Sequence, residues 1–128
     1  MNGYMISTQD APGIAARLLE ATAARGVNVF PAYGLADGRT GIVLVGSDDE
    51  AGLQAAIADA GLSATALEMV TTELDNRPGT GAQLFRRLAD AGVNLRAAVP
   101  IGMTGDKVEI ALAADDAGAL RAALGQSS

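Results

Sequence analysis

The chain has 128 residues, of which 49% are apolar and only 3% aromatic, and it contains neither cysteine nor histidine. These counts fit one domain or two very small ones, and they exclude a disulfide framework, a zinc finger and any catalytic group built on cysteine or histidine. The net charge of −6 argues against non-specific binding to nucleic acid or to an anionic membrane surface, because both need a basic patch.

The first predicted elements are a short strand over Tyr4–Thr8 and a helix that follows it. Pro12 stands near the first helical position, where its fixed φ suits a helix start, and Asp10 suits the positive end of the helix dipole. Gly26 is expected to end this helix. Its inward face is predicted from the spacing of three apolar residues, Ile14, Leu18 and Ala21.

A hairpin and a second helix complete the first half. The pair Asp37-Gly38 is typical of a tight turn, and it lies between predicted strands over Val27–Leu35 and Thr40–Gly46. Asp48 and Asp49 are expected to start the second helix. Four residues at helical spacing are expected to face inward, namely Leu53, Ala56, Ile57 and Ala60.

The segment Leu62–Leu74 has the alternating pattern of a strand, but the pattern shifts by one residue at Leu67. Such a shift indicates either a bulge or a strand that changes its sheet partner. We interpret the segment as the last strand of the first half, running directly into the first strand of the second half.

The second half repeats the first. Residues 76–98 align without a gap to residues 10–32, and nine of the 23 aligned pairs are identical, where about one in ten would match by chance. The most informative matches are the Pro-Gly and Gly-Val-Asn groups. Beyond a one-residue insertion near residues 102–105, the two halves continue to align.

The same elements are therefore predicted again. A helix over Pro78–Ala91 carries the inward residues Leu84, Leu88 and Ala91, and strands follow over Val93–Pro100 and Lys107–Ala113. Asp115 is expected to cap a last helix that contains Leu120 and Leu124, and too few residues remain for a final strand. The predicted fold is α+β: two tandem ferredoxin-like βαββαβ units, residues 1–66 and 67–128, each an antiparallel sheet with helices on one face, the second unit lacking its last strand.

Two motifs at fixed spacing carry a resemblance to a known family. The segments 75–79 (Asp-Asn-Arg-Pro-Gly) and 92–95 (Gly-Val-Asn-Leu) resemble the motifs of an ACT domain, and segments 10–13 and 26–29 repeat the pattern in the first half. The whole chain resembles stand-alone tandem ACT proteins. The resemblance implies a regulatory protein that binds an amino acid at the interface between two ACT units.

The resemblance also implies which residues contact the ligand. They come from the loop before the first helix of each half and from the start of the next strand: Asp10, Ala11, Pro12, Gly13, Ile14 and Asn28 in the first half, and Asp75, Asn76, Pro78, Gly79, Thr80, Asn94 and Leu95 in the second. In relatives that sense serine, a histidine lies two positions before the loop asparagine. Leu74 occupies that position here, so a more apolar ligand is equally compatible.

The physical chemistry of these residues suits such a ligand. Unpaired backbone N–H groups and the dipole at a helix start attract a carboxylate, and Gly79 lets a ligand approach the backbone closely. Asn76 and Asn94 offer donors and acceptors for the ammonium and carboxylate of one small amino acid. In the first half, Asp10 replaces Asn76 and suits an ammonium group.

Each feature also has a purely structural interpretation. The Pro-Gly pairs can simply shape a turn, and Asn28 and Asn94 can pair with nearby backbone groups. The aspartate pairs 48–49 and 115–116 are interpreted as helix starts rather than metal ligands, and Arg86-Arg87 as a solvated helix face. We expect no metal and no cofactor.

Three functions from different classes remain open. The first is an amino-acid sensor that acts on a partner such as a metabolic enzyme, and the second is a ligand-free association module that forms a homodimer through open sheet edges. The third is an enzyme, which we do not expect, because no catalytic carboxylate pair is apparent. With no long apolar run and no secretion signal in residues 1–10, we expect a cytoplasmic protein that binds no membrane and no nucleic acid.

Overall fold

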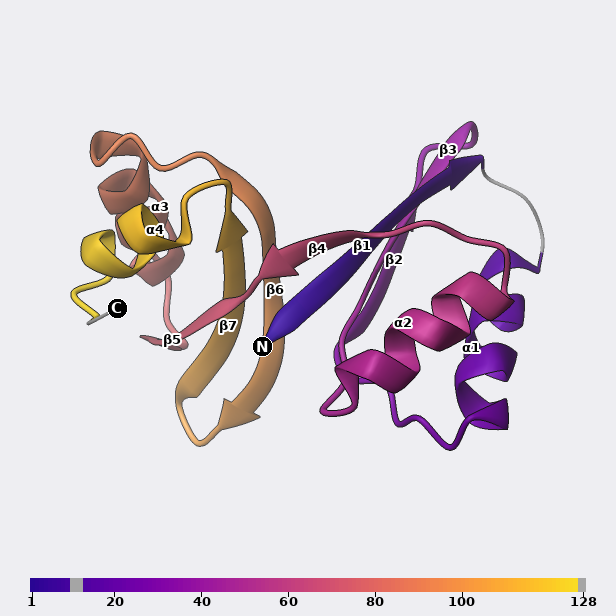
Figure 1. Cartoon of the computed structure of the whole chain (residues 1–128). Coiled ribbons are helices and arrows are strands. Elements are labelled where there is room, and N and C mark those ends of the chain that lie inside the picture. The colour runs from indigo at the N-terminus through magenta and orange to yellow at the C-terminus, as the bar shows by residue number, and fades with distance from the viewer. Residues whose placement is uncertain (10–12, 127–128) are drawn as a thin grey trace. The chain divides into compact units, whose positions relative to one another are not determined.

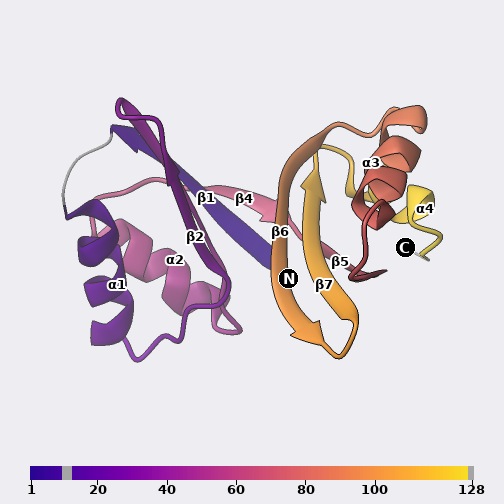
Figure 2. The same ribbon diagram turned by 180° about the vertical axis from the view of Figure 1, so that it is seen from behind.

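The computed structural model describes residues 1–9 and 13–126 (Figure 1). The chain folds as two compact units, Met1–Leu67 and Glu68–Ser128. Each unit consists of one antiparallel sheet with two helices on one face (Figures 1 and 2). The α+β class and the two ferredoxin-like units expected from the sequence are confirmed.

Unit 1 contains a four-stranded sheet with the order β2-β3-β1-β4, which is the arrangement of a complete βαββαβ unit. Every strand and helix predicted for the first half is present. The elements are β1 (Asn2–Gln9), α1 (Ile14–Ala24), β2 (Ala32–Ala36), β3 (Thr40–Val45), α2 (Glu50–Asp59) and β4 (Thr65–Glu68).

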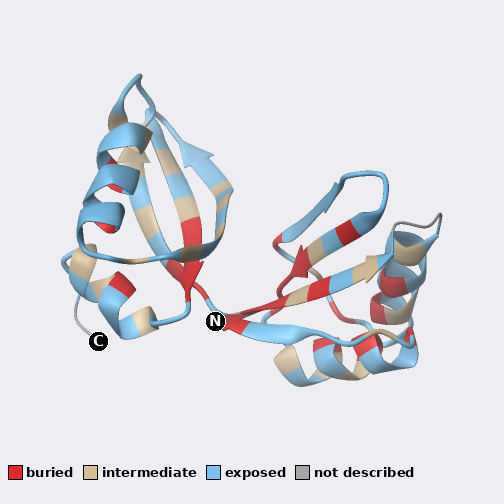
Figure 3. Ribbon diagram, turned by 90° about the horizontal axis from the view of Figure 1, so that it is seen from above, coloured by how far each residue is buried: buried red, intermediate tan, exposed pale blue. Residues whose placement is uncertain are grey.

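The core of unit 1 lies between the sheet and the two helices, where the buried segments are red in Figure 3. Leu18 of α1 and the pair Leu53 and Ile57 of α2 pack against Tyr4 and Ile6 of β1. These are the positions that helical spacing predicts for the inward faces of both helices, except that Ile14 and Ala21 are only half-buried.

Unit 2 contains a three-stranded sheet with the order β5-β7-β6. Within the part of the chain that the structure describes, no strand pairs with the outer edge of β5, as the short second half predicts. Leu84 and Leu88 of α3 pack with Leu112 of β7 and Leu120 of α4, whereas Ala91 is exposed rather than inward. The elements are β5 (Val70–Asp75), α3 (Thr80–Asp90), β6 (Leu95–Thr104), β7 (Lys107–Ala114) and α4 (Ala117–Ala123).

The segment between the halves changes its sheet partner, as its shift in apolar phase predicts. β4 belongs to the four-stranded sheet, and β5 belongs to the three-stranded one. Met69 separates the two strands and is buried.

The predicted strand over Val27–Leu35 is too long, because β2 begins only at Ala32. Two backbone hydrogen bonds hold the preceding residues against the end of β3: Phe30 N–H donates to Gly46 O, and Gly46 N–H donates to Pro31 O, each at 2.9 Å. Val27 is buried in the core before the strand starts. In unit 2 the predicted strand is instead too short, since β6 continues past Pro100 to Thr104.

In each of the aspartate pairs 48–49 and 115–116, only the second residue caps a helix. Asp49 caps α2, with its Oδ1 accepting from Gly52 N–H at 2.9 Å, and Asp116 caps α4 by accepting from Ala119 N–H at 3.0 Å. Asp115 is therefore not the cap that the sequence predicts. Its carboxylate instead accepts from the guanidinium of Arg96 at 2.9 Å.

The caps give a prediction about stability. We expect Asp49→Ala to lower the free energy of unfolding by about 1 kcal/mol, because the substitution leaves a first-turn N–H without its acceptor. Asp48→Ala removes an exposed neighbour that does not cap the helix, so its effect is expected to stay within about 0.5 kcal/mol. Urea denaturation of both variants measures the difference, and equal losses would contradict the assignment.

None of the helices in the described residues has the length and apolar character needed to cross a membrane.

Candidate functional site

Within residues 1–9 and 13–126, two helices begin without a side-chain cap, and they are the same helix of each unit. The N-cap residues of α1 and α3 are Gly13 and Gly79, with φ of 87° and 93°, and neither helix has an acidic residue in its first turn. Both glycines adopt the left-handed conformation that other residues rarely take. No described side chain caps the first N–H groups of α1 and α3, so those without a backbone partner are suited to an anionic group.

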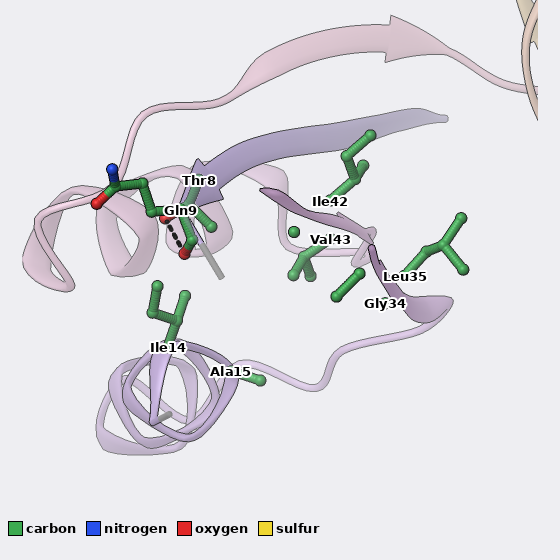
Figure 4. A pocket seen from close by; sticks show the side chains of 10 residues that line it. Thr8, Gln9, Ile14, Ala15, Gly34, Leu35, Ile42 and Val43 are labelled. Carbon is green, nitrogen blue, oxygen red and sulfur yellow. Dashed lines mark hydrogen bonds between the residues drawn. The ribbon is translucent and has the colours of Figure 1, made fainter. Parts of the chain in front are cut away.

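We call the junction of β1 and α1 corner 1. A pocket of about 260 Å³ opens there, between the start of α1 and the β2–β3 hairpin. Figure 4 shows Ile14 and Val43 directed toward this space, with Leu35 directed away from it. Thr8 and Gln9 supply its polar groups. Ile14 is the predicted ligand contact that lines the pocket, and Gly13 caps the adjoining helix.

Three further predicted contacts of corner 1, Asp10, Ala11 and Pro12, lie outside the described residues. Asn28 lies in the segment before β2, and its side chain is exposed. Its backbone carbonyl accepts a hydrogen bond from Ser47 Oγ at 2.7 Å. Because β2 begins opposite Val45 and β1 ends opposite Thr40, Asn28 lies toward the end of the sheet away from corner 1. The unit does not bring it to the pocket.

We call the junction of β5 and α3 corner 2. Its pocket has a volume of about 400 Å³. Of the predicted contacts, Asp75 and Thr80 line it. Thr80 Oγ1 donates to Asp75 O at 2.7 Å, which ties the start of α3 to the end of β5. Asn76 and Pro78 are exposed on the connecting loop, and Asn76 N–H donates to Asp106 O.

The carboxylate of Asp75 pairs with two cationic side chains at corner 2. It forms an ion pair with Lys107 Nζ, and Arg77 lies 3.6 Å from its other oxygen. The hydrogen bond and the charge of Lys107 lower the pKa of Asp75 below its ordinary value, and Asp75 in turn raises the pKa of Lys107. Both side chains are partly exposed to solvent, so the pair contributes little net stability.

The ion pair between Asp75 and Lys107 gives a prediction about the titration of the Asp75 carboxyl group. Because Lys107 lowers the folded-state pKa of Asp75, the contribution of this pair to stability is present at neutral pH and is lost as the pH falls through that pKa. We expect Lys107→Met to raise the pKa of Asp75 toward its ordinary value, as measured by NMR titration of the side-chain carboxyl. Arg77→Met should raise it less, and an unchanged pKa in Lys107→Met would contradict the pairing.

Asn76 and Asn94 lie at opposite ends of the same sheet. Asp75, just before Asn76, pairs with Lys107, whereas Leu95, just after Asn94, pairs with Ala114. The seven residue steps from Lys107 to Ala114 along β7 span about 24 Å at roughly 3.4 Å per residue. The unit therefore does not bring the two asparagines together around one amino acid. Leu95 packs against the core of unit 2, not into the pocket.

Seven lining residues of corner 2 were not among the ligand contacts predicted from the sequence. Thr80, Gln83 and Arg87 follow at intervals of three and four along α3, which places them on one helix face. This spacing was the available signal. Arg86 and Arg87 are both exposed, as expected for a solvated helix face, and Arg86 lies 3.6 Å from Asp90. The seven residues are Glu73, Leu74, Arg77, Gln83, Leu84, Arg87 and Lys107. Among the described residues, no cluster of side chains is suited to hold a metal ion.

No protein-family model and no curated protein matches the sequence. Solved structures do resemble it. The ligand-free regulatory subunit of aspartate kinase from Thermus thermophilus is 22% identical, with a TM-score of 0.61 over 99% of this chain and 91% of that one. The corresponding subunit from Thermus flavus is also 22% identical, with a TM-score of 0.64 over 97% of this chain and 90% of that one.

A protein from Bacteroides thetaiotaomicron is 15% identical, with a TM-score of 0.80 over 97% of this chain and 85% of its own length. At these identities the likeness concerns the fold. It extends along nearly the whole chain, so both units share the architecture of the aspartate kinase regulatory subunits, which agrees with the tandem fold expected from the repeated motifs.

Proposed function

We propose that this protein with a tandem ACT fold is a regulatory protein that binds a small amino acid at its strand-to-helix corners and transmits the binding to a partner protein. The observation that carries the proposal is the pattern of helix caps. The helices α2 and α4 are closed by Asp49 and Asp116, whereas α1 and α3 begin at uncapped glycines beside open pockets.

The uncapped helix starts suit the one group that all amino acids share. An α-carboxylate can accept hydrogen bonds from the first N–H groups of α1 or α3, where the helix dipole also favours negative charge. The pocket beside each corner then faces the ligand's side chain. A ligand this small gains at most about 1.5 kcal/mol per heavy atom, so we expect micromolar to millimolar affinity.

The experiment that tests this proposal is an amide NMR titration of the full chain with amino acids. We expect the amides at the start of α1 and α3, residues 14–17 and 80–83, to shift on binding. The matched internal control is the start of α2 and α4, residues 50–53 and 117–120, where the Asp49 and Asp116 side chains already accept from the N–H groups of Gly52 and Ala119. Equal shifts at all four helix starts, or none at any, would contradict the proposal.

A second candidate function is association through a sheet edge, which strand β2 favours. All five residues of β2 (Ala32–Ala36) are exposed, none is charged, and Leu35 is 78% exposed. The other edge strands carry features that discourage pairing: β4 is short and ends at Glu68, β5 carries Glu73, and β6 contains Pro100. The same edge would let the sensor form a homodimer.

Pairing through the β2 edge gives a prediction about the molecular mass of the protein in solution. If two copies pair through β2, Leu35→Lys places a charge in the pairing edge, and we expect the dimer to dissociate in sedimentation analysis at micromolar concentration. Leu19→Lys on α1, where the wild-type side chain is 47% exposed, is the control and should leave the mass unchanged. A wild-type monomer would remove the association function and leave the sensor to act on a different partner.

A further inference from the structure

We propose that unit 1 contains a binding site for the ammonium group of a short primary alkylamine, in a pocket between α2 and β4. The pocket has a volume of about 330 Å³, which is within the range of small-molecule sites. Its lining residues come from β1, from α2 and from the segment 62–66, all within unit 1, and none of them lines the pocket of either corner. The site is therefore distinct from the proposed amino-acid sites.

A buried tyrosine supplies the polar wall of this pocket. Tyr4 is only 4% exposed, and its hydroxyl donates to Glu50 Oε1 at 2.8 Å while accepting from Gln54 Nε2 at 2.6 Å. Because the phenolic proton is directed to the carboxylate, the oxygen can offer a ligand only its remaining lone pair. Gln54 also lines the pocket, and its amide oxygen is a second acceptor. The polar wall therefore suits a ligand that donates hydrogen bonds.

The electrostatics of this wall favour a positively charged donor. The hydrogen bond from Tyr4 is the main cause that lowers the pKa of Glu50 below its ordinary value, so the carboxylate is ionised at neutral pH and polarises the phenolic oxygen. The pocket also follows the C-terminal half of α2 at Ile57 and Ala58, where the helix dipole favours a cation. An ammonium group combines the donors and the charge that these features select.

The remaining walls suit a short hydrocarbon chain. Ile57 belongs to the core of unit 1, and Leu62 packs against that core. Three alanines, at positions 58, 64 and 66, complete the lining and leave the space beside these two side chains open. An unbranched alkyl chain can bury apolar area there while its ammonium group reaches the hydroxyl of Tyr4.

The fold itself does not require this polar wall. Alignment of the two halves places Val70 where Tyr4 stands, at the same register position of the sheet, and Val70 is part of the core of unit 2. The helix position of Gln54 is taken in unit 2 by Arg121, whose guanidinium donates to Glu68 at 3.1 Å. Unit 2 thus carries a cation of its own at this helix position, whereas unit 1 presents acceptors there.

The test is an amide NMR titration of the full chain with n-butylammonium and with its neutral isostere n-butanol. We expect the amides of residues 54–66 to shift, with millimolar affinity for n-butylammonium and weaker binding of n-butanol. Tyr4→Phe should weaken n-butylammonium binding about tenfold, because a charge-assisted hydrogen bond is lost. The matched control is Tyr33→Phe, which changes the other tyrosine of the chain, on β2 outside the pocket, and should leave the affinity within about twofold.

A second variant keeps the test decisive if Tyr4→Phe disturbs the core. Glu50→Gln removes the charge behind Tyr4, and we expect about threefold weaker binding of n-butylammonium with n-butanol unaffected. Its control is Glu20→Gln on α1, an exposed glutamate whose replacement changes the net charge equally. Equal binding of the two probes, no shift with either, or equal effects of a variant and its control would overturn the inference. The amides at the starts of α1 and α3 report on the corners separately in the same spectra.

Discussion

Leu112→Ala is expected to lower the free energy of unfolding of unit 2 by about 2–5 kcal/mol. Leu112 lies on β7, the central strand of the three-stranded sheet, and its side chain is fully buried among Leu84, Leu88 and Leu120. Truncation removes apolar contact area and leaves a cavity that such a small core cannot readily close. Urea denaturation followed by amide signals of unit 2 measures the loss.

The control for this substitution lies on the neighbouring strand. Met103 of β6 is 65% exposed, so Met103→Ala is expected to change the free energy of unfolding by less than about 0.5 kcal/mol. A loss below about 1 kcal/mol in Leu112→Ala would mean that the helices of unit 2 do not enclose β7 as described.

Gly52→Ala is expected to destabilise unit 1, although alanine normally stabilises a helix over glycine. A Cβ at residue 52 would lie 2.3 Å from Asp49 Oδ2 and 2.8 Å from Val27 Cγ2. The substitution must therefore displace the N-cap side chain and press on a buried core residue. Cap loss and overpacking together cost more than the roughly 1 kcal/mol gained in helix propensity, so we expect a net loss of about 1–3 kcal/mol.

The matched comparison is Gly81→Ala in α3, where no atom lies within 4 Å of the added Cβ. Here only the propensity term acts, and we expect a gain of up to about 1 kcal/mol. Thermal unfolding of the two variants without ligand should give melting temperatures that move in opposite directions. A gain in both would show that Asp49 and Val27 can yield without cost.

Most of the fold could be predicted from the repeated pattern of the sequence. The one-residue phase shift at Leu67 correctly indicated the change of sheet between β4 and β5, because alternate strand residues face opposite sides of a sheet. The aligned halves also predicted both helix pairs and the three-stranded second sheet. Each of these features depends on periodicity that a single sequence displays directly.

Local tertiary contacts decided what the pattern could not. Val27 and Val29 are apolar and β-branched, so they suggested an early start for β2, yet its pairing with β3 begins only at Ala32, and residues 30–31 bond instead with Gly46 beyond the end of β3. Asp115 and Asp116 are chemically equal candidates for a cap, and Asp115 is drawn to Arg96 across the unit. Neither Gly46 nor Arg96 can be identified as a partner from the sequence pattern alone.

The candidate site, like the fold, could be predicted only in part from the sequence. The Pro-Gly motifs pointed to the uncapped starts of α1 and α3, which the structure contains. The expectation that Asn76 and Asn94 share a ligand failed at the level of one unit, because strand order places the end of β5 and the start of β6 at opposite ends of the sheet.

The central claim is that the protein binds amino acids, and thermal unfolding of the full chain in the presence of each common amino acid tests it most directly. A ligand at 100 times its dissociation constant adds about 2.7 kcal/mol to the stability of the folded state, which corresponds to a rise of several degrees. We predict such a rise for a restricted set of amino acids at millimolar concentration, with the remainder inactive. A melting temperature unchanged by every amino acid would contradict the sensor function. The Pro-Gly motifs would then serve only to shape the turns before α1 and α3.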